Sequence, residues 1–260
     1  MYYIGVDVGS VAAKAVVLKN SEIAASVIQP TGWSPKTSGR EVFERAIEKA
    51  GIACESVSHI VGTGYGRVAL DFVDKAVTEI TCHALGANHW YPENNLVIDI
   101  GGQDSKAILI NNRGKVENFV MNDKCAAGTG RFLQVMAATL GLELDQLSEM
   151  TAAEPVNINS MCTVFAESEV ISLLASGEAK ERILAGLYHS IAGRVSAMTG
   201  SMGVINGVTF TGGVAKNQEM RKILSGVLRC KVDVPEDPQI IGALGAAILA
   251  SSIAQTESAH

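Results

Sequence analysis

The stretch IDIGGQDSKAILI, residues 98–110, has a near copy earlier in the chain, VDVGSVAAKAVVL, at residues 6–18. Laid together without a gap, the two copies share an aspartate, a glycine, a lysine and the same apolar positions. The offset of 92 residues is too long for a solenoid repeat and about right for half of a two-lobed protein. The matched pairs are Asp7 with Asp99, Gly9 with Gly101 and Lys14 with Lys106.

Composition places the chain among globular proteins and narrows the classes of partner. The 260 residues, 47% of them apolar, can bury a large core as one large domain or two small ones. The net charge of −6 and the lack of a long basic run argue against a nucleic-acid or anionic-membrane partner. No apolar stretch approaches the ~20 residues that span a bilayer, and the first residues resemble a strand rather than a secretion signal. A cytoplasmic location is therefore expected.

Strand and helix patterns alternate and divide the chain into two similar halves. Runs typical of strands at 2–8, 13–19 and 23–29 are repeated by runs at 96–101, 104–110 and 115–121. Helical patterns follow each triplet, one of them near 127–140, and YPENN at 91–95 separates the two halves. We therefore expect an α/β protein with one domain over residues 1–94 and a second over 95–241.

Each copy of the repeat places an aspartate at a strand end and a glycine in the following turn. A glycine turn lets backbone N–H groups approach a phosphate closely, and the aspartate can hold a hydrated metal ion or a water. Two such turns would grip a polyphosphate from both sides, whereas one copy alone would favour an ordinary β-hairpin. The predicted turn residues are Asp7, Gly9 and Ser10 in the first copy and Asp99, Gly101 and Gly102 in the second.

The second turn also carries polar side chains that the first turn lacks. Gln103 and Asp104 are candidates for orienting the attacking water in phosphoryl transfer to water. Lys14 and Lys106 follow the turns in the two copies. Each lysine either neutralises phosphate oxygens or is a solvated strand edge, and the sequence leaves both possibilities open.

A third glycine cluster, VTFTGGVAKNQ at residues 208–218, has the pattern of a buried strand, a Gly-Gly turn and a helix start. The glycines allow a flat ring to lie against the backbone, and a helix N-terminus favours anionic groups. A plain connection between a strand and a helix is the alternative. The residues expected to border a nucleoside are Gly212, Gly213, Val214 and Asn217.

Two of the five cysteines precede helical patterns, Cys125 in MNDKCAAGTGRFL and Cys162 in SMCTVFAESEVISLL. A helix N-terminus favours the thiolate, which is the form that binds metal. The chain has no CxxC pair, so neither a disulfide framework nor a local zinc site is expected. A cubane iron–sulfur cluster requires four thiolates, and a two-fold dimer of this chain would supply them from these two positions.

Other cysteines and acids near these segments have ordinary explanations. Cys54, Cys82 and Cys230 are expected to serve as packing residues. Glu167 and Glu169, at the front of the expected helix after Cys162, are as well explained by the helix dipole as by a function.

At its three glycine motifs the sequence resembles the actin, sugar-kinase and heat-shock ATPase superfamily. VDVGS, IDIGGQDSK and TGGVAKN stand where that superfamily has its two phosphate loops and its adenosine loop. The resemblance implies an actin-like ATPase fold, with two ribonuclease-H-like lobes and a nucleotide cleft that holds ATP or ADP with Mg²⁺. It also implies that the last helix, about residues 242–260, returns to complete the first lobe.

The two cysteine segments, together with TGYGR at 63–67, look like the activator family of 2-hydroxyacyl-CoA dehydratases, which belongs with the ATPase subunits of benzoyl-CoA reductases. The match covers most of the chain. In that family a homodimer carries one [4Fe–4S] cluster between its subunits, so the ligands here would be Cys125 and Cys162. The family passes one low-potential electron to a partner iron–sulfur enzyme, driven by ATP hydrolysis. A dehydratase, a ring reductase or a double-cubane protein would be that partner, and ferredoxin or flavodoxin the electron donor.

Two other classes of protein fit parts of the pattern. A small-molecule kinase would use both phosphate turns and would form ADP only in the presence of a sugar or carboxylate acceptor. A filament-forming nucleotide switch would assemble with ATP and show no redox activity. Neither class needs two thiols at helix starts, so the cysteine pair favours the activator.

Overall fold

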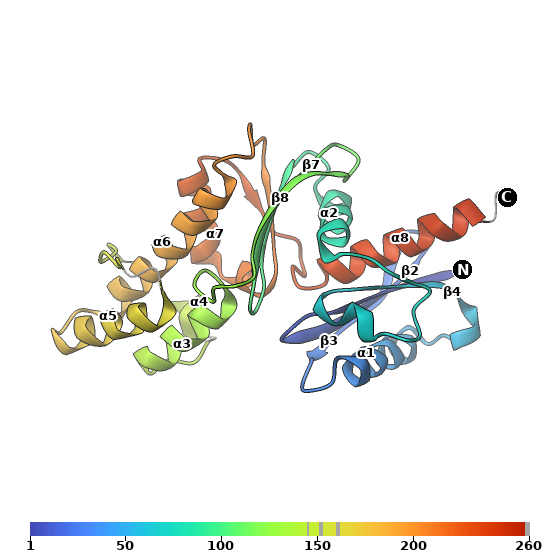
Figure 1. The fold of residues 1–260 in the computed structure, drawn as a ribbon, viewed down its shortest axis with the longest axis horizontal. Coiled ribbons are helices and arrows are strands. Elements are labelled where there is room, and N and C mark those ends of the chain that lie inside the picture. Colours follow the sequence, from blue (N-terminus) through green and yellow to red (C-terminus); the bar gives the residue numbers. More distant parts are fainter. Residues whose placement is uncertain (145, 151–152, 160–161, 258–260) are drawn as a thin grey trace. The chain divides into compact units, whose positions relative to one another are not determined.

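The computed structural model describes residues 1–144, 146–150, 153–159 and 162–257, and the chain forms two compact units (Figure 1). The first unit contains residues 1–93, 110–117 and those from 235 onward, and the second contains 94–109 and 118–234. Each unit is built on one five-stranded mixed sheet with helices packed on it. Among the described residues, no helix has both the length and the apolar character needed to span a membrane.

The first unit consists of the N-terminal elements and the last helix. Its strands are β1 (Tyr2–Val8), β2 (Ala12–Lys19), β3 (Glu22–Pro30), β4 (Val57–Thr63) and β5 (Lys75–Ala76). Its helices are α1 (Pro35–Ala50), α2 (Glu79–Trp90) and α8 (Ile241–Glu257), with short 3₁₀ turns η1 (Cys54–Ser56) and η2 (Tyr65–Ala69).

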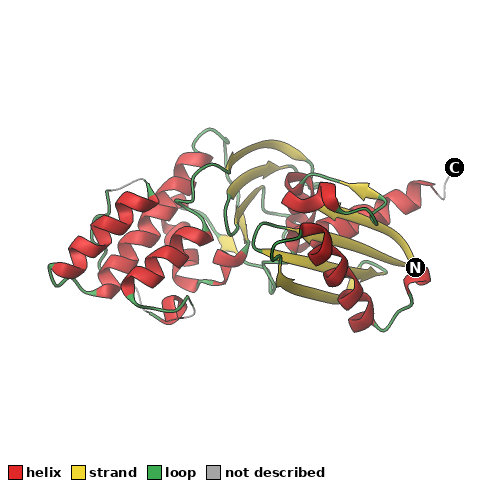
Figure 2. Cartoon of the chain, turned by 60° about the horizontal axis from the view of Figure 1, so that its bottom comes forward, coloured by secondary structure: helices red, strands yellow, loops and turns green. Residues whose placement is uncertain are grey.

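The second unit repeats the strand pattern and adds a group of helices that lies beside its sheet (Figure 2). Its strands are β6 (Leu96–Ile100), β7 (Ser105–Ile110), β8 (Val116–Asn122), β9 (Val208–Thr211) and β10 (Val232–Asp233). Its helices are α3 (Gly130–Leu140), α4 (Gln146–Glu149), α5 (Thr163–Ala175), α6 (Lys180–Thr199) and α7 (Gln218–Leu228), with a 3₁₀ turn η3 (Gly213–Lys216).

The two sheets have the same topology. The first has strand order β3-β2-β1-β4-β5, and the second has the corresponding order β8-β7-β6-β9-β10. In both, the first strand pairs antiparallel with the second and parallel with the fourth, so the repeat seen in the sequence is a repeat of whole sheets. The predicted strand triplets are confirmed within one or two residues, whereas the short strands β5 and β10 carry too few residues to give a sequence pattern.

In the first unit, α8 packs against β1 and α2 at distances that only glycine permits. A Cβ atom at Gly5 would collide with the carbonyl oxygen of Ala243, and one at Gly245 would collide with the carbonyl oxygen of Cys82. The apolar GALGAA start of α8 is buried in this contact. The chain therefore returns to its first sheet after completing the second.

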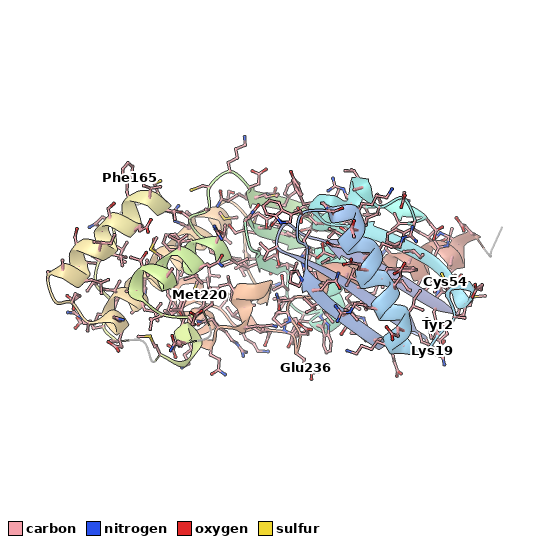
Figure 3. All side chains as sticks on the ribbon, turned by 90° about the horizontal axis from the view of Figure 1, so that it is seen from below. Tyr2, Lys19, Cys54, Phe165, Met220 and Glu236 are labelled. Carbon is pink, nitrogen blue, oxygen red and sulfur yellow. The ribbon has the colours of Figure 1, made fainter. Side chains whose placement is uncertain are left out.

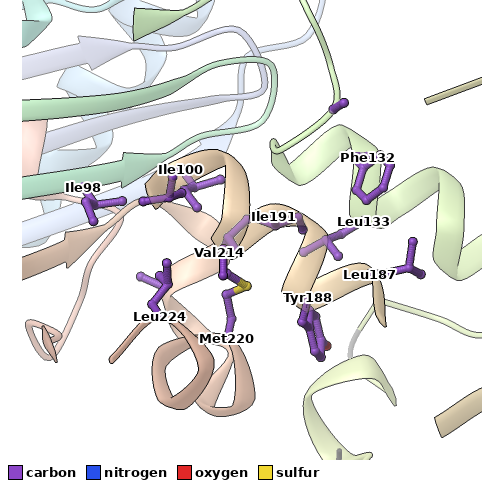
Figure 4. Close-up of a cluster of buried hydrophobic side chains, with 14 of the residues drawn as sticks. Ile98, Ile100, Phe132, Leu133, Leu187, Tyr188, Ile191, Val214, Met220 and Leu224 are labelled. Atoms are coloured by element: carbon purple, nitrogen blue, oxygen red, sulfur yellow. The ribbon is translucent and has the colours of Figure 1, made fainter. Parts of the chain in front are cut away.

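The core of the second unit joins the sheet to the helices (Figure 4). Ile98 and Ile100 of β6 meet Phe132 of α3 and Ile191 of α6 in one buried cluster. Truncation of a buried phenylalanine costs about 3–5 kcal/mol, so side chains of this kind fix the helices on the sheet. The pattern predicted the first helix of this unit from residue 127, but α3 begins three residues later, at Gly130, since residues 126–129 form a turn closed by Thr129 N–H on the Ala126 carbonyl (3.1 Å).

Candidate nucleotide and cysteine sites

The first predicted phosphate turn lies between β1 and β2. Asp7 is 3% exposed at the end of β1, and Lys14 faces it in the strand register with its Nζ 3.1 Å from Asp7 Oδ2. The turn is closed by Gly9 N–H on the Ala12 carbonyl (3.0 Å), and Thr31 donates its hydroxyl to the Gly9 carbonyl (2.8 Å). The backbone of the turn is therefore held on both sides, while Ser10 is exposed.

The second turn, between β6 and β7, repeats this geometry and adds a carboxylate. Lys106 Nζ lies 3.2 Å from Asp99 Oδ2 and 2.8 Å from Asp104 Oδ1. Its side chain is only 2% exposed, which rules out the solvated strand edge, one of the two possibilities that the sequence left open for this lysine. Gly101 N–H donates to the Asp104 carbonyl (3.0 Å), and Gln103 at the tip is exposed.

A glycine with positive φ follows the neighbouring parallel strand in both units. Gly64 after β4 has φ +86°, and Gly212 after β9 has φ +87°. A Cβ atom at Gly64 would collide with Asp7 Oδ1, and one at Gly212 would lie 3.0 Å from Asp99 Oδ1. In both units a glycine turn thus packs against the strand-end aspartate, and a 3₁₀ helix begins directly after that glycine.

The sequence patterns did not predict that Gly64 and Gly212 occupy equivalent positions in the two units. The threonine before each glycine pairs in parallel register with the aspartate of its own unit, Thr63 with Asp7 and Thr211 with Asp99. Thr211 also donates its hydroxyl to Asp99 Oδ1 at 2.8 Å. The shared Thr-Gly step in GTGYGR and FTGGVA was the available signal, but it is too short to stand out without the strand pairing.

The residues predicted to border a nucleoside lie at the start of η3 and α7. Gly213 is exposed, whereas Val214 and Asn217 are buried. The side chain of Asn217 caps α7 by accepting from Met220 N–H (2.9 Å) and donates to the Tyr188 hydroxyl (2.7 Å). Burial is the main cause that raises the pKa of Tyr188 to about 12, so the hydroxyl stays protonated at neutral pH.

Cys125 lies in the loop between β8 and α3, five residues before the helix, rather than at its first turn. It is half-buried, and Asn122 fixes its backbone: Asn122 Nδ2 donates to the Cys125 carbonyl (2.8 Å), and Cys125 N–H donates to Asn122 Oδ1 (3.3 Å). The expectation of a helix-start position is therefore wrong for this cysteine.

Cys162 is the N-cap residue of α5 and is exposed, which confirms the predicted position at a helix start. The helix behind it is apolar yet buries only Ala166 and Val170. Its exposed apolar side chains include Val164, Phe165 and Ile171, with exposed fractions of 65%, 67% and 54%, and Phe165 is labelled in Figure 3.

The acids of α5 hold neighbouring elements. Glu167 accepts from the Thr139 hydroxyl (3.3 Å), and Glu169 accepts from Asn159 N–H (3.0 Å). Neither lies in the first turn of the helix, which has no acidic residue, so the explanation through the helix dipole is wrong.

The other three cysteines differ in exposure. Cys82 is fully buried, and burial is the main cause that raises the pKa of its thiol to about 12, as expected for a packing residue. Cys230 is half-buried against the core of the second unit, and burial raises the pKa of this thiol as well. Cys54 is exposed at the start of η1 (Figure 3), so the expectation that it packs is wrong.

A complete metal site is not present within one copy of the described chain. Among residues 1–144, 146–150, 153–159 and 162–257, no three His, Cys, Asp or Glu side chains are grouped closely enough to hold a metal ion. The thiols of Cys125 and Cys162 have the chemistry that an iron–sulfur cluster requires, but they would supply only two of its four ligands. These two thiols fit such a cluster only if a second copy of the chain contributes its own Cys125 and Cys162.

Comparison with known proteins identifies the family of this chain. Residues 4–250 match the model of the BadF/BadG/BcrA/BcrD ATPase family. The chain is 45% identical to the 2-hydroxyisocaproyl-CoA dehydratase activator of Clostridioides difficile, over 96% of this chain and 95% of that protein. It is also 45% identical to the activator of lactoyl-CoA dehydratase of Anaerotignum propionicum, over 98% and 99% of the two chains.

Comparison with solved structures also finds a dehydratase activator. The activator of the 2-hydroxyisocaproyl-CoA dehydratase from Clostridium difficile with bound ADPNP superimposes with a TM-score of 0.93 at 43% identity, covering 99% of this chain and 97% of that one. A ROK hexokinase from Thermus thermophilus superimposes with a TM-score of 0.58 at 15% identity, over 97% of this chain and 99% of that one, which shows a shared fold alone. The chain has the actin-like ATPase fold and belongs to the BadF/BadG/BcrA/BcrD ATPase family.

Proposed function

We propose that this chain is an ATP-dependent reductive activator, which hydrolyses ATP to drive transfer of one low-potential electron to a partner iron–sulfur enzyme. The observation that carries the proposal is the presence, in one ATPase chain, of two turns with an Asp–Lys ion pair, a half-buried thiol at Cys125 and an exposed thiol at Cys162. Relatives with 45% identity over nearly the whole chain are named dehydratase activators, which supports the same role.

For hydrolysis, we assign the two strand-end aspartates to the metal and to water. Asp7 and Asp99 would hold hydrated Mg²⁺, because carboxylate oxygens and water are the ligands that this ion prefers. Asp104 would orient the attacking water together with Gln103. Lys106 supports this assignment, since its contact with Asp104 Oδ1 (2.8 Å) fixes one carboxylate oxygen and leaves the carboxylate 25% exposed.

For nucleotide binding, we assign the glycine turns and the residues around them. Backbone N–H groups of such turns bind phosphate oxygens, and the glycines let a ligand approach the backbone closely. Lys14 and Lys106 would add positive charge beside the phosphates. The binding residues we propose are Gly9, Ser10, Lys14, Gly101, Gly102, Lys106, Gly212, Gly213, Val214 and Asn217. The two domains that would carry them are residues 1–94 with about 242–260, of which 258–260 lie outside the described residues, and residues 95–241.

For electron transfer, we propose that Cys125 and Cys162 of two copies bind one [4Fe–4S] cluster. When bound, the cluster supplies a single electron at low potential. The remaining contribution comes from the chain itself, which holds Cys125 in a loop bonded by Asn122 and presents Cys162 at the N-terminus of α5. A helix N-terminus favours a thiolate and an anionic cluster, which supports the assignment of Cys162.

The exposed face of α5 supports a homodimer. Val164, Phe165 and Ile171 are each more than half exposed on α5, the helix that Cys162 precedes as N-cap residue. A second copy that supplies two more cysteines would cover apolar side chains on the same helix, and burial of such surface contributes about 25 cal/mol per Å². A two-fold axis makes the interface self-complementary, as a shared four-thiolate site requires.

The partner would be an iron–sulfur enzyme that needs a low-potential electron. The named relatives activate acyl-CoA dehydratases, and one component of the benzoyl-CoA reductase of Thauera aromatica is 32% identical, over 94% of this chain and 91% of that protein. We therefore propose a 2-hydroxyacyl-CoA dehydratase, a benzoyl-CoA-type reductase or a double-cubane protein as acceptor. Ferredoxin or flavodoxin would be the donor, and a cytoplasmic location stays a prediction of the sequence.

The test is purification under strictly anaerobic conditions, followed by iron and sulfide analysis and an ATPase assay without a phosphoryl acceptor. We expect about four irons per dimer and slow release of ADP and phosphate in the absence of any partner. ADP formation that strictly requires a sugar or carboxylate would instead identify a kinase. Iron-free protein with ATP-dependent assembly would identify a filament-forming switch.

A further inference from the structure

The helix that follows the Cys125 loop, α3, is bonded at its first two residues to the second predicted phosphate turn. Gly130 N–H donates to the Gly101 carbonyl at 2.8 Å, and Arg131 N–H donates to the Gly102 carbonyl, also at 2.8 Å. A Cβ atom at Gly130 would lie 3.0 Å from the Gly101 oxygen, so the two backbones touch. The first residues of α3 therefore contact the turn that we assign to nucleotide phosphate.

At the other end of the Cys125 loop, one side chain holds the backbone by hydrogen bonds. Asn122, the last residue of β8, donates from Nδ2 to the carbonyls of Cys125 (2.8 Å) and Ala127 (3.3 Å), and its Oδ1 accepts from Cys125 N–H (3.3 Å). Three hydrogen bonds from one amide fix the backbone on both sides of the cysteine. Asn122 is half-buried, which shields these bonds from water.

The segment between these two attachments is short and constrained. Thr129 closes a turn onto the Ala126 carbonyl through both its backbone N–H and its hydroxyl (3.1 and 2.5 Å). Gly128 has φ +87°, and the aliphatic part of Arg194 lies 3.1 Å from where its Cβ would stand. The loop is therefore held at both ends and in its middle by hydrogen bonds and close contacts, so few of its residues are free to move independently of the turn at 101–102.

We propose that Asn122 is a positioning residue that couples the second phosphate turn to Cys125, so that the nucleotide state changes the exposure of this cysteine. The inference rests on the proposed function in one respect, the assignment of Gly101 and Gly102 to nucleotide phosphate. A nucleotide shifts such an equilibrium only by its differential affinity for the two states, so ATP and ADP must bind the turn differently. Asn122 is suited to this role because its one side chain bonds the backbone on both flanks of Cys125.

The test measures the rate at which maleimide labels Cys125 in the full-length chain freed of metal by a chelator. Labelling is followed by peptide mass spectrometry with ADP and with ADPNP, and the exposed Cys54 in the other unit serves as the internal reference. In the wild type we expect a severalfold difference in the Cys125 rate between the two nucleotides, and an unchanged rate at Cys54. Equal Cys125 rates in the two states would overturn the proposal.

The decisive variant is Asn122→Asp. It keeps the oxygen that accepts from Cys125 N–H but replaces the amide donor with an anionic oxygen that faces two carbonyls. We expect the Cys125 rate to become independent of nucleotide, with ADP affinity retained. The matched control is Asn118→Asp on the same strand, whose side chain accepts from Phe119 N–H at the surface, and it should keep the wild-type difference. Retention of that difference in Asn122→Asp, or its loss in Asn118→Asp, would contradict the proposal.

A second measurement needs no variant and remains valid if Asn122→Asp fails to fold. Hydrogen exchange of the wild type should show the amides of Cys125, Gly130 and Arg131 changing protection together between ADP and ADPNP. Independent behaviour of Cys125 would overturn the coupling. Iron content and acceptor-free hydrolysis are measured separately from this coupling. If the protein contains iron and hydrolyses ATP but its Cys125 amide behaves independently, the coupling through Asn122 is wrong and the proposed function stands.

Discussion

Lys106 faces Asp99 across the register of β6 and β7, with its Nζ 3.2 Å from the carboxylate and its side chain 2% exposed. The corresponding pair in the first unit, Lys14 and Asp7, has nearly the same separation, 3.1 Å, but its lysine is 15% exposed. The repeat therefore keeps an ion pair at each turn. Asp104 adds a second carboxylate to the lysine of the second turn, which makes the two turns chemically unequal.

Replacement of this buried lysine should be costly. In Lys106→Met, two carboxylates lose a cationic contact at 3.2 and 2.8 Å, and breaking a buried ion pair costs about 3–5 kcal/mol of the free energy of unfolding. The matched control is Lys222→Met, because that lysine is 68% exposed in its pair with Glu219 and should change stability by less than about 1 kcal/mol. Urea unfolding measures both, and equal losses would contradict the burial argument.

Replacement of the second strand-end aspartate should separate hydrolysis from binding. Asp99→Asn removes the charge proposed to act on magnesium and water, so we expect the hydrolysis rate to fall by about a hundredfold, the loss typical of one preorganised electrostatic group. ADP affinity should change far less. Asp71→Asn, on an exposed carboxylate paired with Lys36, is the control and should leave hydrolysis unchanged. A variant that loses ADP binding and hydrolysis to the same degree would place Asp99 in binding instead.

The cluster assignment predicts the iron content of cysteine variants. Cys125→Ser and Cys162→Ser each remove two of four thiolates in a dimer, and serine oxygen is a poor ligand for an iron–sulfur cluster. Each variant should lose nearly all iron after anaerobic purification and should still bind nucleotide. Cys54→Ser and Cys230→Ser should retain iron. Full iron content in Cys125→Ser would end this assignment.

The two glycines behind the strand-end aspartates should not tolerate a side chain. Gly64→Ala and Gly212→Ala combine a left-handed backbone with a Cβ that meets backbone and carboxylate oxygens, so each should cost more than the ~1–2 kcal/mol of backbone strain alone. Gly177→Ala is the matched control, since Gly177 has φ +83° and open space around its Cβ position. Thermal unfolding should rank Gly177→Ala as the mildest of the three, and the opposite order would refute the steric argument.

Stability should fall in alkaline solution because Cys82 is buried as a neutral thiol. Its pKa is raised from 9.0 to about 12 in the folded protein, mainly by burial, so above pH 9 the unfolded chain loses a proton that the folded chain keeps. The unfolded state is then favoured by up to about 1.4 kcal/mol per pH unit for this group. Urea midpoints between pH 8 and 10.5 should fall more steeply in the wild type and in the exposed control Cys54→Ala than in Cys82→Ala. Parallel slopes in all three proteins would exclude this cause.

Much of the architecture follows from local patterns. The strand triplets were predicted because alternation and turn residues act over a few positions, and the doubled Asp-Gly-Lys pattern predicted two similar halves. Cys162 was placed correctly at a helix start for the same local reason. The sequence placed Cys125 at a helix start because it did not show the turn at residues 126–129, after which α3 begins. A turn of four residues is too short to give a periodic pattern.

The sequence by itself determined the repeat and the α/β fold class and pointed to Cys125 and Cys162 as candidate ligands, because these inferences depend only on the order of the residues. Only the tertiary structure decided that Gly64 and Gly212 pack against the two aspartates and that Lys106 contacts both Asp99 and Asp104. It also decided that Asn122 bonds the backbone of Cys125 and that α3, after this loop, is bonded to the turn at residues 101–102. These contacts depend on strand register and helix packing. Such contacts form between segments that are distant in the chain, and a local sequence pattern does not predict which residues of those segments will be in contact.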